Sequence, residues 1–456
     1  MATNPFTQGD TRITLTADEL ATARANGSLI INSQRTRPYW FDGRFLAARD
    51  LAREQDYFLQ RQADLAQAAG FEVIHGLQVR TPGPTDPTND AETVIISAGH
   101  GITPAGELVL ITSDLTLKLS DLAEEENLDV QFGLSRNPQP PARTRTGLYV
   151  LALRPVEFTA NPITAYPTSI QGSRTTHDGD IVEATAAVLV PYPDPVSSAD
   201  AAHRRAALAR QIFLTGSSSQ ISQSLLPLAM ISLQRGAIEW VDPYLVRRDT
   251  GPDFSGLRFG LADRATQEAF LLQYDAQLQE SLATRKNAGL SLGFAASDYF
   301  QALPPAGRFP LPSINVGASD FSQIFFPQQL DVRLSVVPVD ELPALIEQGM
   351  SLPPIDLTLT PDAYANLTVF SLVPVPRAGF AALKAGLPTL PPRVTLPQVL
   401  STRPPIDLLR LYRGGLQVAP PPATASNAWA SAIGNQTYGY YIRGRSAPQF
   451  VDFTSA

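Results

Sequence analysis

An apolar stripe with helical spacing runs along residues 44–69, where no glycine or proline interrupts the chain. Leu51, Phe58 and Leu65 recur every seven residues, and charged residues occupy many of the positions between them. Residues with this separation lie nearly above one another, because an α-helix completes a turn about every 3.6 residues. The pattern predicts one long amphipathic helix, which Gly70 ends.

A second stripe follows in residues 261–289. Leu271, Tyr274, Leu278 and Leu282 fall at i, i+3, i+7 and i+11, which is the spacing of a helix–helix contact. We expect this helix to form a neck, in which the stripe packs against the same stripe of symmetry-related copies.

Two shorter helices are indicated by their ends and composition. Thr16 and Glu19 have the spacing of a capping box, and Gly27 marks the end of the helix that they start. Residues 198–214 form a further helix candidate that precedes a β-type segment.

After Gly70 the apolar period changes from helical to alternating. Short runs rich in Val, Ile, Leu and Thr are separated by turn-forming residues, which predicts strands. These runs are FEVIHGLQV, ETVIISAG, ELVLITSDLTLKL, TGLYVLALRPVEFT and IVEATAAVLVPYP, with GSLIINSQ as a brief strand before the long helix. Gln234, Arg235 and Gly236 predict a hairpin turn within LLPLAMISLQRGAIEWVDPYLVRR.

Proline concentrates in the last third of the chain, where residues 301–456 hold 22 of the 40 prolines. Apolar residues still alternate there, and strands are predicted at residues 329–337, 355–360 and 367–374. The final segment, NAWASAIGNQTYGYYIRGRSAPQFVDFTSA, is rich in aromatic residues and glycine. It is interpreted either as a terminal strand or as an arm that packs on a neighbour.

Together these elements predict an α+β protein that is mainly β. Residues 1–250 are expected to form a β-sandwich-like, particle-docking domain that carries the long helix of residues 44–69. Residues 251–300 are expected to form the helical neck, and residues 301–456 a proline-rich β domain with an aromatic C-terminal segment.

The composition indicates assembly with other subunits. Charged residues make up 17% of the chain, below the roughly 25% usual in soluble domains, which favours a surface covered by partners or by copies of the chain. The alternative is a proline-rich β protein whose composition follows its genome. A net charge of −8 without a basic tail or stripe argues against nucleic acid. The N-terminus lacks the pattern of a secretory signal, and no apolar run is long enough to cross a membrane, which predicts synthesis in the cytoplasm.

Candidate chemistry is sparse. The chain has no cysteine, so disulfides, thiolate metal sites and a cysteine nucleophile are excluded. GLSLG places Ser291 in a nucleophile-elbow pattern, but a predicted helix precedes it and the last histidine, His203, comes before it in the chain. His75 and His100 fit a strand and a loop, and His177 in HDGD is a weak metal pattern without a distant partner. We therefore expect a non-catalytic protein without metal or cofactor.

An aromatic cluster precedes the long helix. Tyr39, Trp40 and Phe41 run into Asp42 and Gly43, and glycine accepts the positive φ that a turn requires at this point. We expect the aromatics to hold the start of the helix on the β domain, while part of the helix surface meets other copies or a neighbouring subunit. The alternative is that all of these side chains are core of the same chain.

The segment RPYWFDGRFLAARDLAREQDYFLQRQADLAQAAGFEVIHGLQV resembles baseplate- and fibre-associated proteins of phage-tail-like contractile injection systems. The resemblance rests on an aromatic-acidic-glycine turn, a helix with Glu-Gln-x-Tyr and a Gly-Leu-x-Val strand, here FDG, EQDY and GLQV. VIISAGHGITPAGELVLI, LLPLAMISLQRGAIEWVDPYLVRR and FFPQQLDVRLSVVPVDELPALI are similar to further segments of such proteins.

The order of turn, helix and strand is also similar to the TssK family of type VI secretion baseplate proteins. This chain has GRFLAARDL where that family carries a longer GMFL-x-PQHF motif. The resemblance implies a homotrimer that joins other baseplate or tail subunits in a virion or injection device. The alternative is a receptor- or glycan-binding tail fibre module that stacks sugars on Trp429, Tyr438, Tyr440 and Tyr441, and a tail hydrolase using Ser291 is a third hypothesis.

Overall fold

A computed structural model describes most of the 456-residue chain. The described residues are 16–26, 37–38, 43, 45–69, 72–122, 145–166, 173–194, 200–215, 221–249, 264–316, 321–387, 425–434 and 436–444. They belong to two compact units, residues 1–69 and residues 70–456. The α+β class that the sequence predicts, with β structure prevailing, is confirmed.

The first unit contains the two helices expected from the N-terminal sequence. Helix α1 (Ala17–Ala25) starts at the predicted capping box, in which the Thr16 amide donates to Glu19 Oε2 at 2.8 Å and the Glu19 amide donates to Thr16 Oγ1 at 3.3 Å. Helix α2 (Ala48–Ala69) is the predicted long helix and begins four residues later than the pattern indicated. The expected strand GSLIINSQ lies outside the described residues.

Three antiparallel sheets are described in the N-terminal half of the second unit. Their strand orders are β1-β4-β5, β2-β3-β6 and β10-β9-β7-β8. Each of the six β segments predicted within residues 71–250 contains at least one strand. The last of them contains the predicted hairpin between β9 and β10, with Arg235 and Gly236 both at positive φ. The strands are β1 (Glu72–Gly76), β2 (Val79–Arg80), β3 (Thr93–Ile96), β4 (Gly99–Ile102), β5 (Leu108–Ile111), β6 (Leu115–Lys118), β7 (Gly147–Ala165), β8 (Thr175–Tyr192), β9 (Leu226–Gln234) and β10 (Ala237–Asp242), with the short helix η2 (Leu119–Asp121) after β6.

The apolar faces of these sheets share one core, which makes the region sandwich-like as predicted. Val73, Ile96, Val109, Leu151 and Leu228 are among its fully buried members and come from all three sheets. Val109 of β5 is buried between exposed neighbours, because successive side chains of a strand point to opposite sides. Strand β3 and most of β9 are instead buried on both sides.

Helices cover part of the four-stranded sheet. Helix α3 (Ala201–Arg210) continues as the π-helical turn η4 (Gln211–Thr215), in place of the single helix predicted for residues 198–214. Helix α4 (Arg264–Asn287) is the second predicted long helix, and Gly289 follows it at φ +67°. The rings of Phe213 and Phe270 stack at 4.5 Å and join η4 and α4 in a core that includes Met230 of the sheet.

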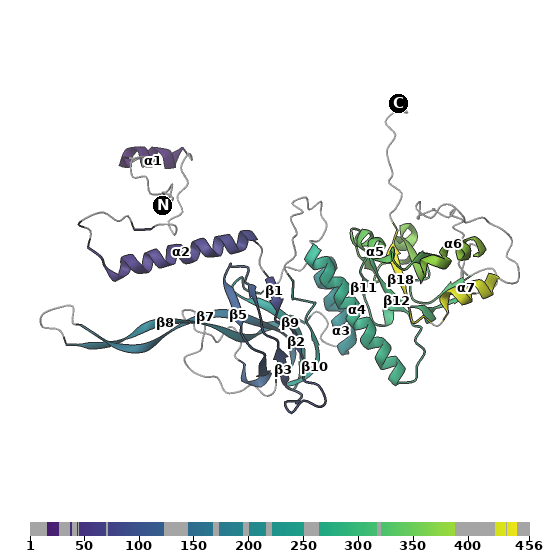
Figure 1. Cartoon of the computed structure of the whole chain (residues 1–456), viewed down its shortest axis with the longest axis horizontal. Helices are drawn as coiled ribbons and strands as arrows, with labels where there is room; N and C mark the ends of the chain where they lie inside the picture. Colours follow the sequence, from purple (N-terminus) through teal and green to yellow (C-terminus); the bar gives the residue numbers. More distant parts are fainter. Residues whose placement is uncertain are drawn as a thin grey trace. The chain divides into compact units, whose positions relative to one another are not determined.

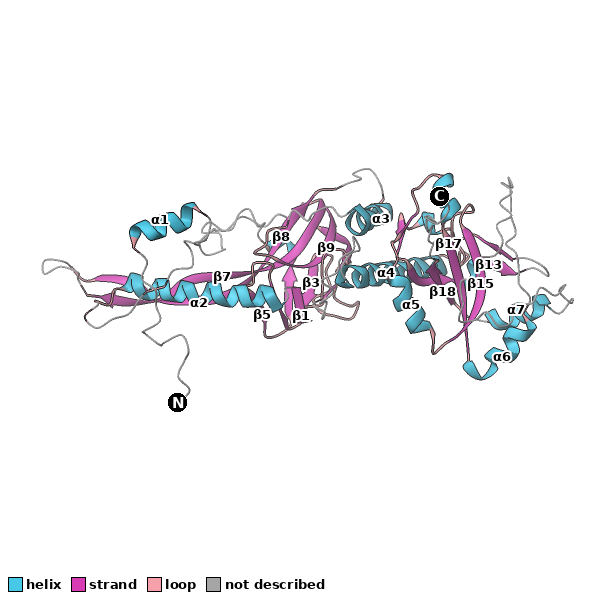
Figure 2. Cartoon of the chain, turned by 90° about the horizontal axis from the view of Figure 1, so that it is seen from above, coloured by secondary structure: helices cyan, strands magenta, loops and turns pink. Residues whose placement is uncertain are grey.

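The C-terminal part of the second unit is built on a mixed sheet with the order β12-β18-β17-β15. Strands β15 and β17 are parallel and are connected through α5, whereas β18 is antiparallel to both of its neighbours. Figure 2 shows β15, β17 and β18 side by side. The strands are β11 (Ala302–Leu303), β12 (Ala306–Pro310), β13 (Ile314–Val316), β14 (Phe321–Gln323), β15 (Asp331–Pro338), β16 (Ile355–Asp356), β17 (Thr368–Val375) and β18 (Tyr438–Arg443).

The sequence underestimated the helices of this part. The helices are α5 (Leu342–Met350), α6 (Arg377–Gly386) and α7 (Ala425–Ile433), with the short helices η5 (Ala296–Asp298), η6 (Leu311–Ser313) and η7 (Pro361–Asn366). None of α5, α6 and α7 was predicted. Helix α5 was not predicted because it contains a proline. Pro343 lies in the first turn of the helix, where its missing amide hydrogen costs no hydrogen bond. Of the strand predicted for residues 355–360, only the first two residues form a strand, β16.

Candidate interaction surfaces

The apolar stripe of α2 is exposed. Leu51, Phe58 and Leu65 have 46%, 54% and 66% of their surface accessible. Gly43 lies in the preceding turn at φ +92°, as expected, and a Cβ there would meet nothing within 4 Å. Tyr39, Trp40 and Phe41 lie outside the described residues, so their expected role at the start of the helix stays a prediction.

One flank of α2 is covered although it is more polar than the stripe. Asp50 is buried at 6% accessibility, and Arg53 Nη2 donates to its Oδ1 at 3.3 Å. The guanidinium of Arg37 lies 5.7 Å from the ring centre of Tyr57, one row away from the stripe. A helix usually buries its apolar face and exposes its charges. On α2 the stripe and most of the charged residues are exposed, and Asp50 is the buried exception among the described charged residues of the helix.

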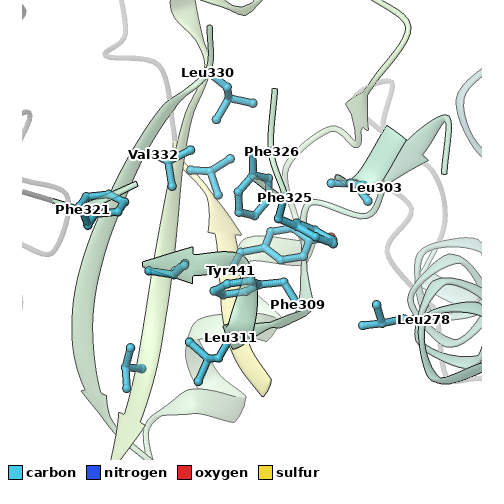
Figure 3. Close-up of a cluster of buried hydrophobic side chains, with 14 of the residues drawn as sticks. Leu278, Leu303, Phe309, Leu311, Phe321, Phe325, Phe326, Leu330, Val332 and Tyr441 are labelled. Carbon is cyan, nitrogen blue, oxygen red and sulfur yellow. The ribbon is translucent and has the colours of Figure 1, made fainter. Parts of the chain in front are cut away.

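The stripe of α4 is placed differently. Leu271 is half-buried, whereas Tyr274, Leu278 and Leu282 are buried in the main core of residues 264–444. Figure 3 shows Leu278 beside the cluster that contains Phe309 and Tyr441. These three side chains therefore pack inside the chain, and the contact between symmetry-related copies expected of the neck has no support from their positions.

An ionic cluster centred on the buried Arg205 and Asp242 links α3 and α4 to the N-terminal sheet, with Glu280 at its exposed edge. Arg205 of α3 donates from Nε to Asp242 Oδ2 at 2.6 Å and from Nη1 to Glu280 Oε2 at 2.5 Å. Asp242 is fully buried and also accepts from Gln273 Nε2 at 3.3 Å. Each charge taken from water must have a close partner to be tolerated. The cluster therefore has a structural role, and its charged groups are hydrogen-bonded to one another within the chain.

A second ion pair joins α3 to the C-terminal part. Arg210 binds Asp356 of β16 with two parallel hydrogen bonds of 3.0 and 2.7 Å. Burial alone would raise the pKa of the Asp356 carboxyl, but hydrogen bonds from Arg210 and Thr358 outweigh it and hold that pKa below its usual value. The charge of Asp356 is therefore engaged within the chain.

Strands β7 and β8 form a ribbon that continues beyond the rest of their sheet (Figure 1). β7 pairs with β8 from Leu148 opposite Tyr192 to Ala165 opposite Thr175, whereas β9 pairs with β7 only as far as Leu153. The continuation, residues 156–166 and 173–184, is called the distal ribbon below. Ile163 and Ile181 in it are 58% and 66% accessible.

The sequence predicted only the base of this ribbon. The expected strands ended at Thr159 and began at Ile181, because Asn161, Pro162 and Gly179 are typical turn residues. In the structure Asn161 keeps its place in the strand at φ +60°, and its side chain donates to Asp180 Oδ2 at 2.6 Å. The β-branched residues around Ile163 and Thr175 were the signal that could have revealed it.

The C-terminal aromatics are mainly internal. Trp429 and Tyr441 are buried in the core, and Tyr438 and Tyr440 are half-buried. Strand β18 lies between β12 and β17 of the same chain. The described part of the terminal segment therefore contains the expected strand, preceded by α7, while residues 445–456 lie outside the described residues. Of the four aromatics expected to stack on sugars, Trp429 and Tyr441 are thus covered by the core, whereas Tyr438 and Tyr440 keep part of their surface accessible.

The described residues bring no catalytic constellation together. Ser291 lies in a loop after α4, where its Oγ accepts from the Gly293 amide at 3.2 Å, and no strand leads into it. Asp200 caps α3 by accepting from the His203 amide, and the His203 ring also contacts its carboxylate. His75 and His100 pair across β1 and β4, and His177 lies in the distal ribbon. Within the described ranges, no group of three or more metal-binding side chains occurs. Among the described helices, none is long and apolar enough to span a membrane.

No protein-family model and no curated protein matches the chain. Among solved structures, it has a distant likeness to the crystal structure of TssK, with a TM-score of 0.24, 9% identity, and coverage of 56% of this chain and 49% of that one. The baseplate complex from the type VI secretion system gives a TM-score of 0.21 and 14% identity, with coverage of 56% and 68%. The chain spans about half the length of the TssK chain that it matches. TM-scores this low do not establish a shared fold.

Proposed function

We propose that this chain is a non-catalytic structural component of a contractile, phage-tail-like particle, located at the baseplate or at the attachment of a fibre. It assembles there with other baseplate or tail subunits and with copies of itself. Three copies is the number that the resemblance to the TssK family implies. The chain is made in the cytoplasm and functions in a virion or an injection device.

The observation that carries the proposal is the exposed apolar stripe of α2. Leu51, Phe58 and Leu65 lie inside the segment that resembles baseplate proteins, and each is about half accessible or more. Each apolar side chain of this size contributes about 1.5–3 kcal/mol when it is fully buried. Burial of these three side chains against another protein surface would therefore favour association strongly.

The distal ribbon supports the same proposal. A two-stranded hairpin is at best marginally stable in water by itself, yet this ribbon carries Ile163 and Ile181 on accessible positions. Contact with a neighbouring subunit would cover these side chains and the unpaired strand edges. The ribbon is therefore assigned to docking on the particle, in agreement with the role expected for residues 1–250.

The proposal is tested by sedimentation of particles from cells that make the chain with a C-terminal tag. The chain is expected in the same gradient fractions as sheath and tube. A variant with Leu51, Phe58 and Leu65 all changed to Asp is expected to stay at the top of the gradient with an unchanged thermal unfolding temperature. Gln60→Asp is the matched control on the opposite side of α2. Wild-type chain found only at the top contradicts the proposal.

The mass of the purified chain in solution then measures its self-association. At 49.2 kDa per chain, a trimer has 3 × 49.2 = 147.6 kDa. Light scattering coupled to size exclusion separates this value from the monomer. A chain that is monomeric alone but sediments with the particle rejects the trimer and keeps the structural role.

A further inference from the structure

Two of the four histidines face each other on the sheet β1-β4-β5. His75 of β1 lies directly opposite His100 of β4, and the centres of their rings are 6.2 Å apart. Residues directly opposite each other on antiparallel strands present their side chains on the same face of the sheet. Val73 and Val109 of this sheet are buried in the core, whereas His75 is exposed and His100 is half-buried. The two imidazoles therefore share the face that points away from the core.

A β-bulge brings the two rings opposite each other. Val73 pairs with Gly101, so that in a regular ladder Ile74 would lie opposite His100. Instead the register shifts between Val73 and His75, and Ile74 is the extra residue. His75 thereby takes the position opposite His100. Bulges re-aim side chains in this way, and they are over-represented next to functional sites.

The backbones of β1 and β4 approach closely beside the pair. Gly76 lies opposite Gly99. A Cβ on Gly99 would clash with the carbonyl oxygen of His75, and a Cβ on Gly76 would clash with that of Ala98. Only glycine permits this approach. It fixes the strand positions from which the two imidazoles project.

A buried arginine holds the end of β1 next to His75. Arg247 donates from Nη1 to the carbonyl oxygen of Leu77 at 2.6 Å and from Nη2 to that of Gly76 at 2.8 Å. Its Nε also donates to Asp249 Oδ1 at 2.9 Å, which compensates the positive charge of the guanidinium. The backbone that carries His75 is thus fixed by hydrogen bonds, and the nearby charge is neutralised within the chain.

The ring nitrogens of the pair are available. Among the described residues, neither imidazole has a hydrogen bond or an ion pair, and each has its ring contact with the other. The other two histidines are placed differently, since the His203 ring contacts the Asp200 carboxylate and His177 lies opposite Ile163. Only the first pair offers two imidazoles to one ligand.

Two imidazoles on one face are a ligand set for a divalent transition metal. Zn²⁺, Cu²⁺ and Ni²⁺ bind imidazole well, and Zn²⁺ does so at about 2.0–2.1 Å from the nitrogen. Accessible side chains change rotamer rapidly, so a small rotation of each ring can bring one nitrogen of each to a shared ion. We propose that His75 and His100 together bind one ion of this class, with water at the remaining positions in the isolated chain.

This site goes beyond the proposed function and departs from the absence of metal expected from the sequence. The two histidines belong to different strands, and only the register of the sheet, including the bulge at Ile74, brings them together. No local pattern in the sequence could show that they meet.

Calorimetric titration of the full-length chain with ZnCl₂ tests the site, with protein that carries no histidine tag. One ion per chain is expected. His75→Ala and His100→Ala should each weaken binding at least about tenfold, because the second ligand is then no longer held beside the first. His177→Ala is the matched control, since it removes an exposed strand histidine without a histidine opposite, and it should leave the affinity unchanged. Mg²⁺, which prefers oxygen ligands, should give no binding heat.

Electron paramagnetic resonance of the chain with one equivalent of Cu²⁺ identifies the ligands. Two imidazole nitrogens are expected on Cu²⁺ in the natural chain, and one in each of the His75→Ala and His100→Ala variants. Circular dichroism of the variants verifies that they are folded, which is expected because His75 is exposed.

The opposite results overturn the site. Absence of binding at millimolar Zn²⁺ does so, and so does Zn²⁺ binding of equal strength in the natural chain and both alanine variants, which places the ion elsewhere. A loss in His177→Ala as large as in His75→Ala also contradicts the assignment to this pair. None of these results bears on the proposed function, which sedimentation with the particle tests separately.

Discussion

The rings of Tyr274 and Tyr441 meet edge to face, with centroids 6.1 Å apart and planes at 90°. One comes from α4 and the other from the last strand, β18, and both are fully buried. Their hydroxyls donate to the backbone carbonyls of Arg308 at 2.5 Å and Pro304 at 3.0 Å. The contact makes β18 part of the core that α4 builds, so this strand supports the second unit from within.

Removal of the Tyr441 ring is expected to destabilise this unit strongly. Tyr441→Ala leaves a cavity beside Tyr274 and Phe326, and large-to-alanine changes of buried aromatics cost about 3–5 kcal/mol. Thermal unfolding followed by circular dichroism measures the loss. Tyr166→Ala is the control, because that ring is exposed, and it should change stability by less than about 0.5 kcal/mol. Equal unfolding temperatures for both variants would show that β18 is not part of the core.

The same two tyrosines predict a loss of stability in base. Burial raises the pKa of both phenols well above the ordinary value, because the interior disfavours the charged phenolate. The unfolded chain ionises near the ordinary tyrosine pKa of about 10, and the folded chain does not. The stabilising effect of the neutral phenols is therefore complete below that pH and declines as the pH rises above it. Chemical unfolding at a series of pH values, compared with a Tyr274→Phe/Tyr441→Phe variant, should show a shallower decline in the variant.

The ionic cluster between α3 and β10 predicts a large effect of a small change. Asp242→Ala leaves the guanidinium of Arg205 buried without its main partner, which costs about 3–5 kcal/mol. The control is Arg264→Ala, which breaks an exposed pair with Glu268 and should cost at most about 0.5 kcal/mol. Denaturant unfolding of both variants distinguishes the two costs. If Asp242→Ala lowers the free energy of unfolding by less than about 1 kcal/mol, water reaches the cluster.

The distal ribbon predicts a separation of folding from assembly. Ile163→Glu with Ile181→Glu changes two accessible side chains and is expected to leave the unfolding temperature unchanged, because neither contributes to the core. Incorporation of the chain into particles should fall, since the proposed contact would then bury two carboxylates. Thr176→Glu, also exposed on the ribbon, is a single-charge comparison. Full incorporation of the double variant would exclude these isoleucines from the docking surface.

The sequence was most informative where structure is local. The Thr16–Glu19 capping box, the uninterrupted stripes of α2 and α4 and the turn at Arg235 and Gly236 depend on residues close together in the chain. Each of these was predicted from a few neighbouring residues, and each is present in the structure. Boundaries differed by a few residues, because helix and strand ends depend on packing as well as on the residues themselves.

The sequence was least informative where packing is non-local. The stripes of α2 and α4 look alike in the sequence, yet Phe58 is exposed, whereas Leu278 is buried in the core cluster that also contains Phe309. Periodicity indicates that a face is apolar, but it does not indicate what covers that face. Likewise, no local pattern showed that β15 and β17 run parallel or that β18 enters between β12 and β17. These pairings join segments far apart in the chain.

Electron microscopy of labelled particles tests the central proposal most directly. Particles are isolated from cells that make the full chain with a C-terminal tag, and the tag is marked with gold-coupled antibody. Gold is expected at one end of the tail, at the baseplate or the base of a fibre, on most particles. Gold along the whole sheath, or particles without gold while the tagged chain remains in solution, would contradict it.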